Sequence, residues 1–515
     1  MLSTLFMELP PINHLTGMGS IRKQTIISSV LIYIGFLTGF VNQYLSTMHG
    51  SFTVEQFGLT RIFFDFAQNM MAFGALGIVP VIYKFYPYYK DNLEANKIDL
   101  MSWAMVTALI GFIIVIASGF AFQPYFVKKF ISRSPLIVEY YYWMFPFAMG
   151  MLFFSIIEGF SWALRLSVVS NFLKETVFRI LISILIGLFY FKLISFQTFV
   201  YLFAFQYLVI FLFLLIYLIR SGNLHFNFTI SRVTRKFWKK MLSMQALLYG
   251  GTLIASVAAT IDSFIIASLL GLKAVGIFDF AQYVANVLQV PQRSIQAVSS
   301  SFLARAWKDK DYNEISRIYS RSCINLLLMS LFLFGNIWLN VKEGIHVLNI
   351  QKEYLDGLSV IFILCMVRIV DAGTGLNAMV INTSTLWRFD FISGVVLIGL
   401  RLPLTYYLIK NYGIIGSAIA ELIAYGIFNF IRYEFLRRKF NMQPFSMKTV
   451  YAILLGLTAY TICYFAFGQL TGWTSIILNG TAFSLIMISG VFYLKLTPDA
   501  MQLYQVVKNK WKRNV

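Results

Sequence analysis

The sequence predicts an all-α polytopic membrane protein with about fourteen transmembrane helices. Hydrophobic residues make up 58% of the 515 residues and charged residues only 12%, whereas soluble domains carry about 25% charged residues. Apolar stretches of about 20 residues, each long enough to cross a hydrocarbon core of about 30 Å, recur along the whole chain. The expected fold is two parallel six-helix lobes followed by a C-terminal helix pair.

The predicted spans follow one another with short loops between them. Length alone allows twelve spans or fourteen, and the positions of the basic residues decide between them. The expected spans lie near 25–45, 58–84, 101–122, 138–160, 172–191, 197–219, 246–270, 276–302, 318–340, 356–378, 385–408, 413–433, 448–467 and 474–494.

Basic residues are concentrated in every second loop. If the N-terminus is cytoplasmic, most of the 42 Lys and Arg residues fall on the inner side, including RVTRKFWKK (232–240), RRK (437–439) and KNKWKR (508–513). Because Lys and Arg are retained on the cytoplasmic side, we expect both termini there and an even number of spans. The formal net charge of +20 then reflects contact with anionic membrane lipids rather than with nucleic acid.

The two halves of the chain resemble each other. FDFAQ occurs at 64–68 and again at 278–282, and LIGL occurs at 185–188 and 397–400. A shift that places Gly58 on Gly276 places Lys90 on Lys308, and a slightly shorter shift places Glu158 on Asp371. Parallel repeats of this kind are a transporter architecture. The predicted divisions are a cytoplasmic tail (1–24), an N-lobe (25–220), a basic linker (221–245), a C-lobe (246–434), a helix pair (448–494) and a basic tail (495–515).

Two segments carry a resemblance to a known family. EQFGLTRIFFDFAQNMMAFGALGIVPVIYKFYPYYKDN (55–92) resembles the second span and following loop of bacterial polysaccharide (oligosaccharide) flippases, and AVGIFDFAQYVANVLQVPQRSIQAVSSSFLARAWKDKD (274–311) resembles the eighth-span counterpart. The superfamily also holds multidrug-extrusion antiporters and the peptidoglycan-precursor flippase. Neither the arginine-rich signature of that flippase nor the glycine- and proline-rich alanine motif of multidrug extruders is present.

This resemblance implies a function and a location. The expected protein flips an undecaprenyl-diphosphate-linked oligosaccharide across the bacterial cytoplasmic (inner) membrane by alternating access, for surface polysaccharide or lipopolysaccharide biosynthesis. It would be a monomer that meets membrane lipids and works beside a polysaccharide polymerase and chain-length machinery. The alternatives are a cation-coupled multidrug or small-amphiphile antiporter, the peptidoglycan-precursor flippase, and a membrane scaffold that transports nothing.

Charged residues inside the spans are the candidate site residues, because each costs several kcal/mol unless it is paired or hydrated. The arginines suit a diphosphate, since a guanidinium binds phosphate oxygens in a bidentate manner. A structural role is the alternative for two of them, because Asp65 and Asp371 lie within one helical turn of an arginine. The substrate-binding candidates are Arg61, Arg293, Arg368 and Arg401.

The membrane acids are candidates for ion coupling. A carboxylate in a low-dielectric site can exchange a proton, or it can bind Na⁺ together with nearby carbonyls. We therefore expect coupling to H⁺ or Na⁺, and we expect no cofactor. Glu421, in the small-residue context GSAIAELIAY, is instead expected to serve helix packing. The ion-coupling candidates are Asp65, Asp262, Asp279 and Asp371.

Sequence signatures of enzymes are absent. The chain has no P-loop, HExxH, CxxC or GxSxG motif, and its three cysteines and four histidines are scattered. Clustered donors are needed for a metal site, so we expect neither a metal nor catalytic activity. Met18, ahead of GSIRKQ, is an alternative start to Met1.

Overall fold

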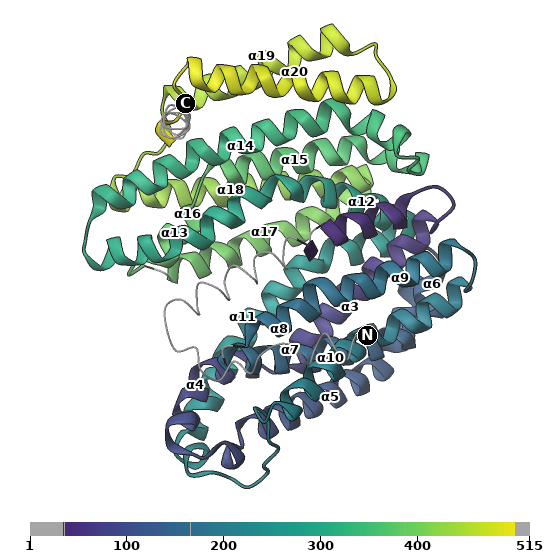
Figure 1. The fold of residues 1–515 in the computed structure, drawn as a ribbon, viewed down its shortest axis with the longest axis vertical. Helices are drawn as coiled ribbons and strands as arrows, with labels where there is room; N and C mark the ends of the chain where they lie inside the picture. Colours follow the sequence, from purple (N-terminus) through teal and green to yellow (C-terminus); the bar gives the residue numbers. More distant parts are fainter. Residues whose placement is uncertain (1–33, 36, 165, 387, 500–515) are drawn as a thin grey trace, which may run out of the picture. The chain divides into compact units, whose positions relative to one another are not determined.

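A computed structural model of the protein describes residues 34–35, 37–164, 166–386 and 388–499 (Figure 1). Helices make up 85% of the structure. Apart from one isolated bridge between Met48 and Ile350, the described ranges contain no extended pairing. The predicted all-α membrane class is therefore confirmed.

The helices follow the apolar stretches of the sequence in order. In chain order they are α3 (Val54–Gly74), α4 (Ile78–Asn92), α5 (Leu100–Phe130), α6 (Pro135–Glu139), α7 (Met144–Ala163), α8 (Ser167–Asn171), α9 (Phe178–Tyr190), α10 (Phe196–Arg220), α11 (Arg232–Leu269), α12 (Leu272–Asn286), α13 (Val290–Lys308), α14 (Tyr312–Val347), α15 (Leu358–Gly373), α16 (Asn377–Asn382), α17 (Arg388–Tyr412), α18 (Ile414–Phe440), α19 (Met447–Phe467) and α20 (Gly472–Tyr493).

Many of these helices are long and apolar enough to cross a membrane. Nine qualify by themselves among the described residues, and α3 with α4 forms a tenth span that bends by 51°. The bend falls at Leu76 and Gly77, which have φ angles of 46° and 74°. Every predicted span from 58–84 onward overlaps helical residues, although several are broken into shorter helices. The count of about fourteen stays a prediction.

The chain divides into two compact units. Unit 1 comprises Met1–Ser46 and Ile62–Thr260, and unit 2 comprises Thr47–Arg61 and Ile261–Val515. The boundaries fall inside α3 and α11, so each of these two helices contributes residues to both units. The lobe boundaries expected from the sequence stay a prediction.

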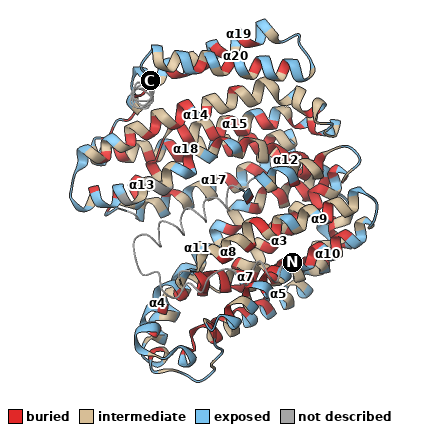
Figure 2. Cartoon of the chain, in the orientation of Figure 1, coloured by how far each residue is buried: buried red, intermediate tan, exposed pale blue. Residues whose placement is uncertain are grey.

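Unit 1 is built around α7, whose residues are mostly buried (Figure 2). Gly150 allows α10 to approach closely, because a Cβ atom there would lie 2.4 Å from the backbone nitrogen of Leu208. Aromatic rings fill the space between helices: Phe64, from the first FDFAQ copy, packs edge-on against Phe147 and Phe203. Aromatic packing thus joins α3, α7 and α10.

Unit 2 is organised around α14, which packs against α15, α19 and α20. Between α14 and α20, the ring of Phe483 occupies the space that a Cβ atom on Gly335 would need. The three cysteine thiols of this unit are buried and free. The helix pair α19–α20 buries few of its residues and exposes most of its apolar side chains (Figure 2).

The glycines paired by the repeat meet in unit 2. A Cβ atom on Gly58 would lie 2.2 Å from the carbonyl oxygen of Leu272, and one on Gly276 would lie 2.3 Å from that of Val54. The start of α3 therefore crosses α12 backbone against backbone. Only glycine permits such a close approach without a shift of one helix.

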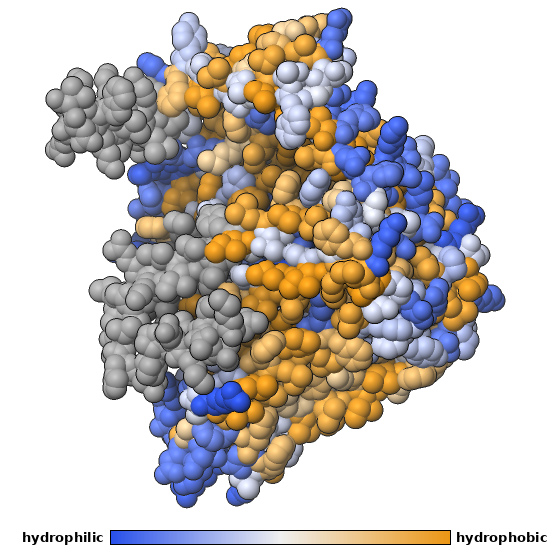
Figure 3. Space-filling model, turned by 45° about the vertical axis from the view of Figure 1, so that its right-hand side comes forward, coloured by the Kyte–Doolittle hydropathy of each residue, from blue (hydrophilic) through white to orange (hydrophobic). Residues whose placement is uncertain are grey.

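The surface has the character of a membrane protein. On the face shown in Figure 3, hydrophobic side chains cover broad continuous areas. Soluble monomers rarely expose apolar patches larger than a few hundred Å², whereas lipid-facing helices do so throughout.

Candidate functional site

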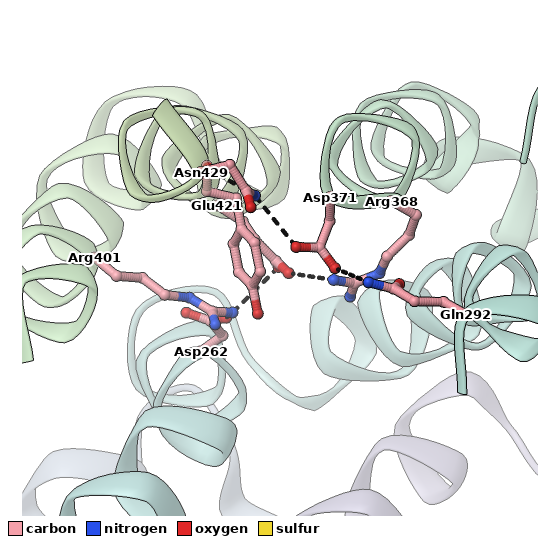
Figure 4. Close-up of polar contacts among 8 residues, drawn as sticks. Asp262, Gln292, Arg368, Asp371, Arg401, Glu421 and Asn429 are labelled. Carbon is pink, nitrogen blue, oxygen red and sulfur yellow. Dashed lines mark hydrogen bonds and ion pairs between the residues drawn. The ribbon is translucent and has the colours of Figure 1, made fainter. Parts of the chain in front are cut away.

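A buried cluster of charges lies among the helices of unit 2 (Figure 4). Arg401 of α17 forms ion pairs with Asp262 of α11 and with Glu421 of α18, the latter at 3.1 Å between Nη2 and Oε2. Arg368 of α15 binds the other oxygen of Glu421 at 3.1 Å. The exposed fraction is 10% for the Arg401 side chain and 7% for that of Arg368. Two cations and two carboxylates thus form a neutral cluster.

Local structure places these side chains together. α17 and α18 form an antiparallel hairpin, and a Cβ atom on Gly416 would lie 2.1 Å from the carbonyl oxygen of Leu408. This tight return brings Glu421 beside Arg401, and α15 also packs against α18. Thr405, one turn after Arg401, also donates a hydrogen bond to Asp262 at 3.3 Å. Such a cluster persists in the membrane because every charge has a partner.

Asp371 lies one turn beyond Arg368 and has different partners. It accepts hydrogen bonds from Gln292 Nε2 at 3.1 Å and Asn429 Nδ2 at 3.2 Å. Asn429 in turn accepts from Asn377 at 2.8 Å. The helix breaks here, between α15 and α16. Asp371 is thus a carboxylate held by neutral amides.

The alternative in which Arg368 pairs with Asp371 on its own helix is not observed. Arg368 does form an ion pair, but with Glu421 on a neighbouring helix. The spacing allowed an intrahelical contact, and the packing of α15 against α18 offered a closer carboxylate. Glu421, which is expected to serve helix packing, also forms ion pairs with two arginines.

The other predicted site residues lie elsewhere. Arg61 forms an ion pair with Asp279 at 3.2 Å, one turn beyond the crossing of Gly58 and Gly276. Asp65 is buried in unit 1. Arg293, on α13, is exposed and makes no ion pair within the described part of the chain. The structure therefore brings Arg368, Arg401 and Asp262 together, and it sets Arg61 with Asp279 in a separate pair.

Further pairs of charges lie within the predicted spans and are not among the predicted site residues. Lys174 binds both carboxylate oxygens of Glu158 in unit 1, and Arg432 pairs with Asp390 in unit 2. Neither Lys174 nor Glu158 is among the residues predicted to bind substrate or to couple ions. A lysine in the first turn of the predicted span 172–191 is the sequence signal that indicates this pair. Among the described residues, no group of three or more His, Cys, Asp or Glu side chains is arranged to hold a metal.

The sequence profile of the family described as "Polysaccharide biosynthesis protein" matches residues 21–302, more than half of the chain. The chain belongs to this family. It is also 23% identical over 498 residues to the uncharacterized membrane protein MJ1068 of Methanocaldococcus jannaschii, covering 87% of this chain and 90% of that protein.

Solved structures share the fold. The lipid II flippase MurJ, in an inward closed conformation, matches with a TM-score of 0.71 and 16% identity, over 92% of this chain and 99% of its own. An inward-facing multidrug resistance transporter of the MATE family matches with a TM-score of 0.62 and 14% identity, over 81% and 98%. The protein is therefore a multi-pass membrane protein of the polysaccharide biosynthesis family with a transporter fold.

Proposed function

We propose that the protein flips an undecaprenyl-diphosphate-linked oligosaccharide across the cytoplasmic membrane by alternating access. The observation that carries this proposal is membership in the polysaccharide biosynthesis family, together with a fold shared with a lipid-linked-precursor flippase. A lipid-linked sugar must move its polar headgroup through the membrane while its tail stays in lipid. Transport of this kind needs a polar path and no bond-breaking chemistry, so the proposed protein is not an enzyme.

Intramembrane arginines suit the headgroup of such a substrate. A guanidinium stays charged at every relevant pH and binds phosphate oxygens in a bidentate manner. Arg293 and Arg61 are the more accessible of the four candidates. Arg368 and Arg401 are neutralised by carboxylates, so they would contact a diphosphate only in a conformation that opens the cluster.

A carboxylate near these arginines would couple flipping to H⁺ or Na⁺. Asp371 is the best placed of the candidates, because amides surround it and a broken helix adjoins it. Unwound backbone carbonyls beside a carboxylate are typical of coupling-ion sites in transporters. Asp65, Asp262 and Asp279 are the further candidates.

A cation-coupled extruder of small amphiphiles is the second candidate function. The likeness to a multidrug transporter fold favours it, as does the number of acids among the spans. Flipping of a peptidoglycan precursor is the third candidate function. A polysaccharide polymerase and chain-length machinery would be partners only under the first proposal, and the proposed flippase acts as a monomer.

The deciding experiment is a complementation assay. The gene is expressed in cells that lack their own flippase for a known surface polysaccharide, and polymer at the surface is quantified with protein level checked. We expect polymer to be restored by the wild type and reduced by Arg293→Gln, while Arg317→Gln, at an exposed surface ion pair, serves as the control. Efflux of cationic dyes without restored polymer would favour the extruder instead.

The proposed orientation can be tested separately. Reporter fusions after residue 238 and after residue 440 should report the cytoplasm, and a fusion near residue 348 should report the outside. An external signal at 238 would contradict both the cytoplasmic termini and the parallel repeat.

A further inference from the structure

A second ion pair among the membrane helices lies in unit 1 and differs from the cluster around Arg401. Lys174 donates hydrogen bonds to Glu158 Oε1 at 3.2 Å and Oε2 at 3.1 Å. The exposed fraction is 40% for the Lys174 side chain and 11% for that of Glu158. The Lys174 side chain is thus partly exposed, whereas the side chain of its carboxylate partner is largely enclosed.

Lys174 lies in an unusual backbone segment. Residues Phe172–Val177 form a π-helix between α8 and α9. Single-turn segments of this kind occur frequently at functional sites. From this segment the Lys174 side chain reaches Glu158 on α7.

Two exposed aromatic rings lie next to this ion pair. One turn beyond Glu158 on α7, Trp162 donates from Nε1 to Ser170 Oγ at 3.1 Å, and Ser170 lies one turn before Lys174. The Tyr83 ring lies 6.2 Å from the Trp162 ring between centroids. Both rings expose more than a third of their area. Lys174, Tyr83 and Trp162 therefore form one patch with a cation at one end and aromatic surface at the other.

The neighbouring charges do not compete for Lys174. Glu175 pairs with Arg179 at 2.7 Å, and Tyr207 near Glu158 is buried. Lys174 is the one basic group that forms an ion pair with Glu158 within the described ranges. An anion that reaches Lys174 would therefore replace a single, identifiable carboxylate.

We propose that Lys174 binds the diphosphate of the lipid-linked substrate by exchanging Glu158 for phosphate oxygens, with Tyr83 and Trp162 as the flanking surface for the headgroup. The inference rests on the proposed function and names a binding site for it. A lysine ammonium binds phosphate as a point charge. Because the Lys174 side chain is partly exposed, a phosphate can approach it without first displacing several protein groups. Glu158 holds the side chain in place when the site is empty.

The position of the patch suits the first encounter with substrate. On the predicted topology, Tyr83 ends the span 58–84, Trp162 follows the span 138–160, and Lys174 begins the span 172–191, all at the cytoplasmic side. Lipid-linked oligosaccharides that are assembled in the cytoplasmic leaflet would meet this patch before any deeper arginine.

The test measures binding of undecaprenyl diphosphate to the full chain in nanodiscs, with undecaprenol as the ligand without phosphates. Lys174→Gln should weaken binding at least about tenfold, because a charge-assisted contact to phosphate is lost. Glu158→Gln should strengthen binding, because the competing carboxylate is gone. Opposite signs for the two partners are the decisive result, since an ion pair that serves only folding would make both variants worse.

Other outcomes separate the site from the function. If Lys174→Gln binds like the wild type, or if both variants weaken binding and the double variant restores it, the assignment of Lys174 is overturned while the flippase proposal stands. If the wild type binds undecaprenyl diphosphate no more tightly than undecaprenol, the proposed function itself is wrong. Equal competition by phosphatidylglycerol or by inorganic diphosphate would overturn recognition of the lipid-linked diphosphate.

Lys174→Arg covers the case in which the Gln variant does not fold. It keeps the charge, so we expect binding within a few-fold of the wild type, and a loss as deep as that expected for the Gln variant would overturn the proposal. Tyr83→Ala should weaken binding of an oligosaccharide-bearing lipid more than that of bare undecaprenyl diphosphate. Equal losses would remove Tyr83 from the headgroup surface.

Discussion

The two units differ in the exposure and the partners of the cations described inside their membrane helices. In unit 2, Arg401 and Arg368 are enclosed and balanced by two carboxylates from other helices. In unit 1, the Lys174 side chain is 40% exposed, and among the described residues it forms an ion pair with Glu158 alone. An enclosed neutral cluster fixes how helices pack, because separating any member leaves a buried charge unpaired. An exposed cation with one partner can exchange that partner for a ligand.

The predicted repeat allows individual carboxylates of the two units to be compared. The alignment of the two halves places Glu158 on Asp371, yet Glu158 binds a lysine and Asp371 binds the amides of Gln292 and Asn429. Positions that the predicted repeat makes equivalent thus carry a carboxylate in both halves with different partners. One suits exchange with an anion, and the other suits a proton or a small cation.

The largest expected effect is from Glu421→Gln. This change leaves Arg368 without its carboxylate and removes one of the two from Arg401, and loss of one partner from a buried ion pair destabilises a protein by about 3–5 kcal/mol. Thermal unfolding of the purified protein measures it. Glu314→Gln, at an exposed pair with Arg317, is the matched control and should change stability little. Equal small effects would mean that the cluster around Arg401 does not hold unit 2 together.

Arg401→Gln and Arg293→Gln should separate stability from transport. Arg401→Gln leaves Asp262 buried without its guanidinium, so we expect reduced thermal stability, and Arg401→Lys should recover only part of it. Arg293→Gln should unfold like the wild type and weaken diphosphate binding about tenfold, as expected for a charge-assisted hydrogen bond. Unfolding temperature and surface polysaccharide are read on the same variants. Full transport by the double Gln variant at normal expression would remove both arginines from the mechanism.

Substitutions of glycine by alanine should change stability by an intermediate amount. Gly58→Ala and Gly276→Ala place a methyl group against a facing carbonyl, and overpacking of this kind destabilises by about 1–3 kcal/mol. Gly187→Ala and Gly399→Ala, in the two LIGL copies, meet nothing within 4 Å. Because alanine is the better helix former by about 0.5–1 kcal/mol, these two controls should be neutral or slightly stabilising. The opposite ranking would contradict the close crossing of α3 and α12.

The smallest stability change is expected for Asp371→Asn. Its partners are the neutral amides of Gln292 and Asn429, and an asparagine can rotate to bond one of them, so the change should stay within about 1 kcal/mol. Transport, in contrast, should lose its dependence on the ion gradient if Asp371 is the coupling residue. Unchanged gradient dependence in reconstituted vesicles would shift that role to Asp65, Asp262 or Asp279.

Much of the fold could be predicted because lipid imposes simple rules on a sequence. Backbone groups must bond within the chain, so apolar stretches of sufficient length become helices. The expected spans from 58–84 onward accordingly overlap the helices observed. The helix breaks were harder to foresee: the bend at Leu76 and Gly77 and the end of α15 at Gly373 fall within predicted spans, where neighbouring helices can support irregular backbone.

The sequence by itself determined the membrane class, the family and the identity of the residues that bear charge within the spans. Tertiary structure decided which of those charges meet. Arg368 has Asp371 within one turn of its own helix, but α18 presents Glu421 to it. Lys174 contacts Glu158 from a π-helix that the sequence FLKETV does not predict. The physical reason is that hydrophobicity is a property of each segment, whereas the partner of a buried charge depends on how segments distant in sequence pack.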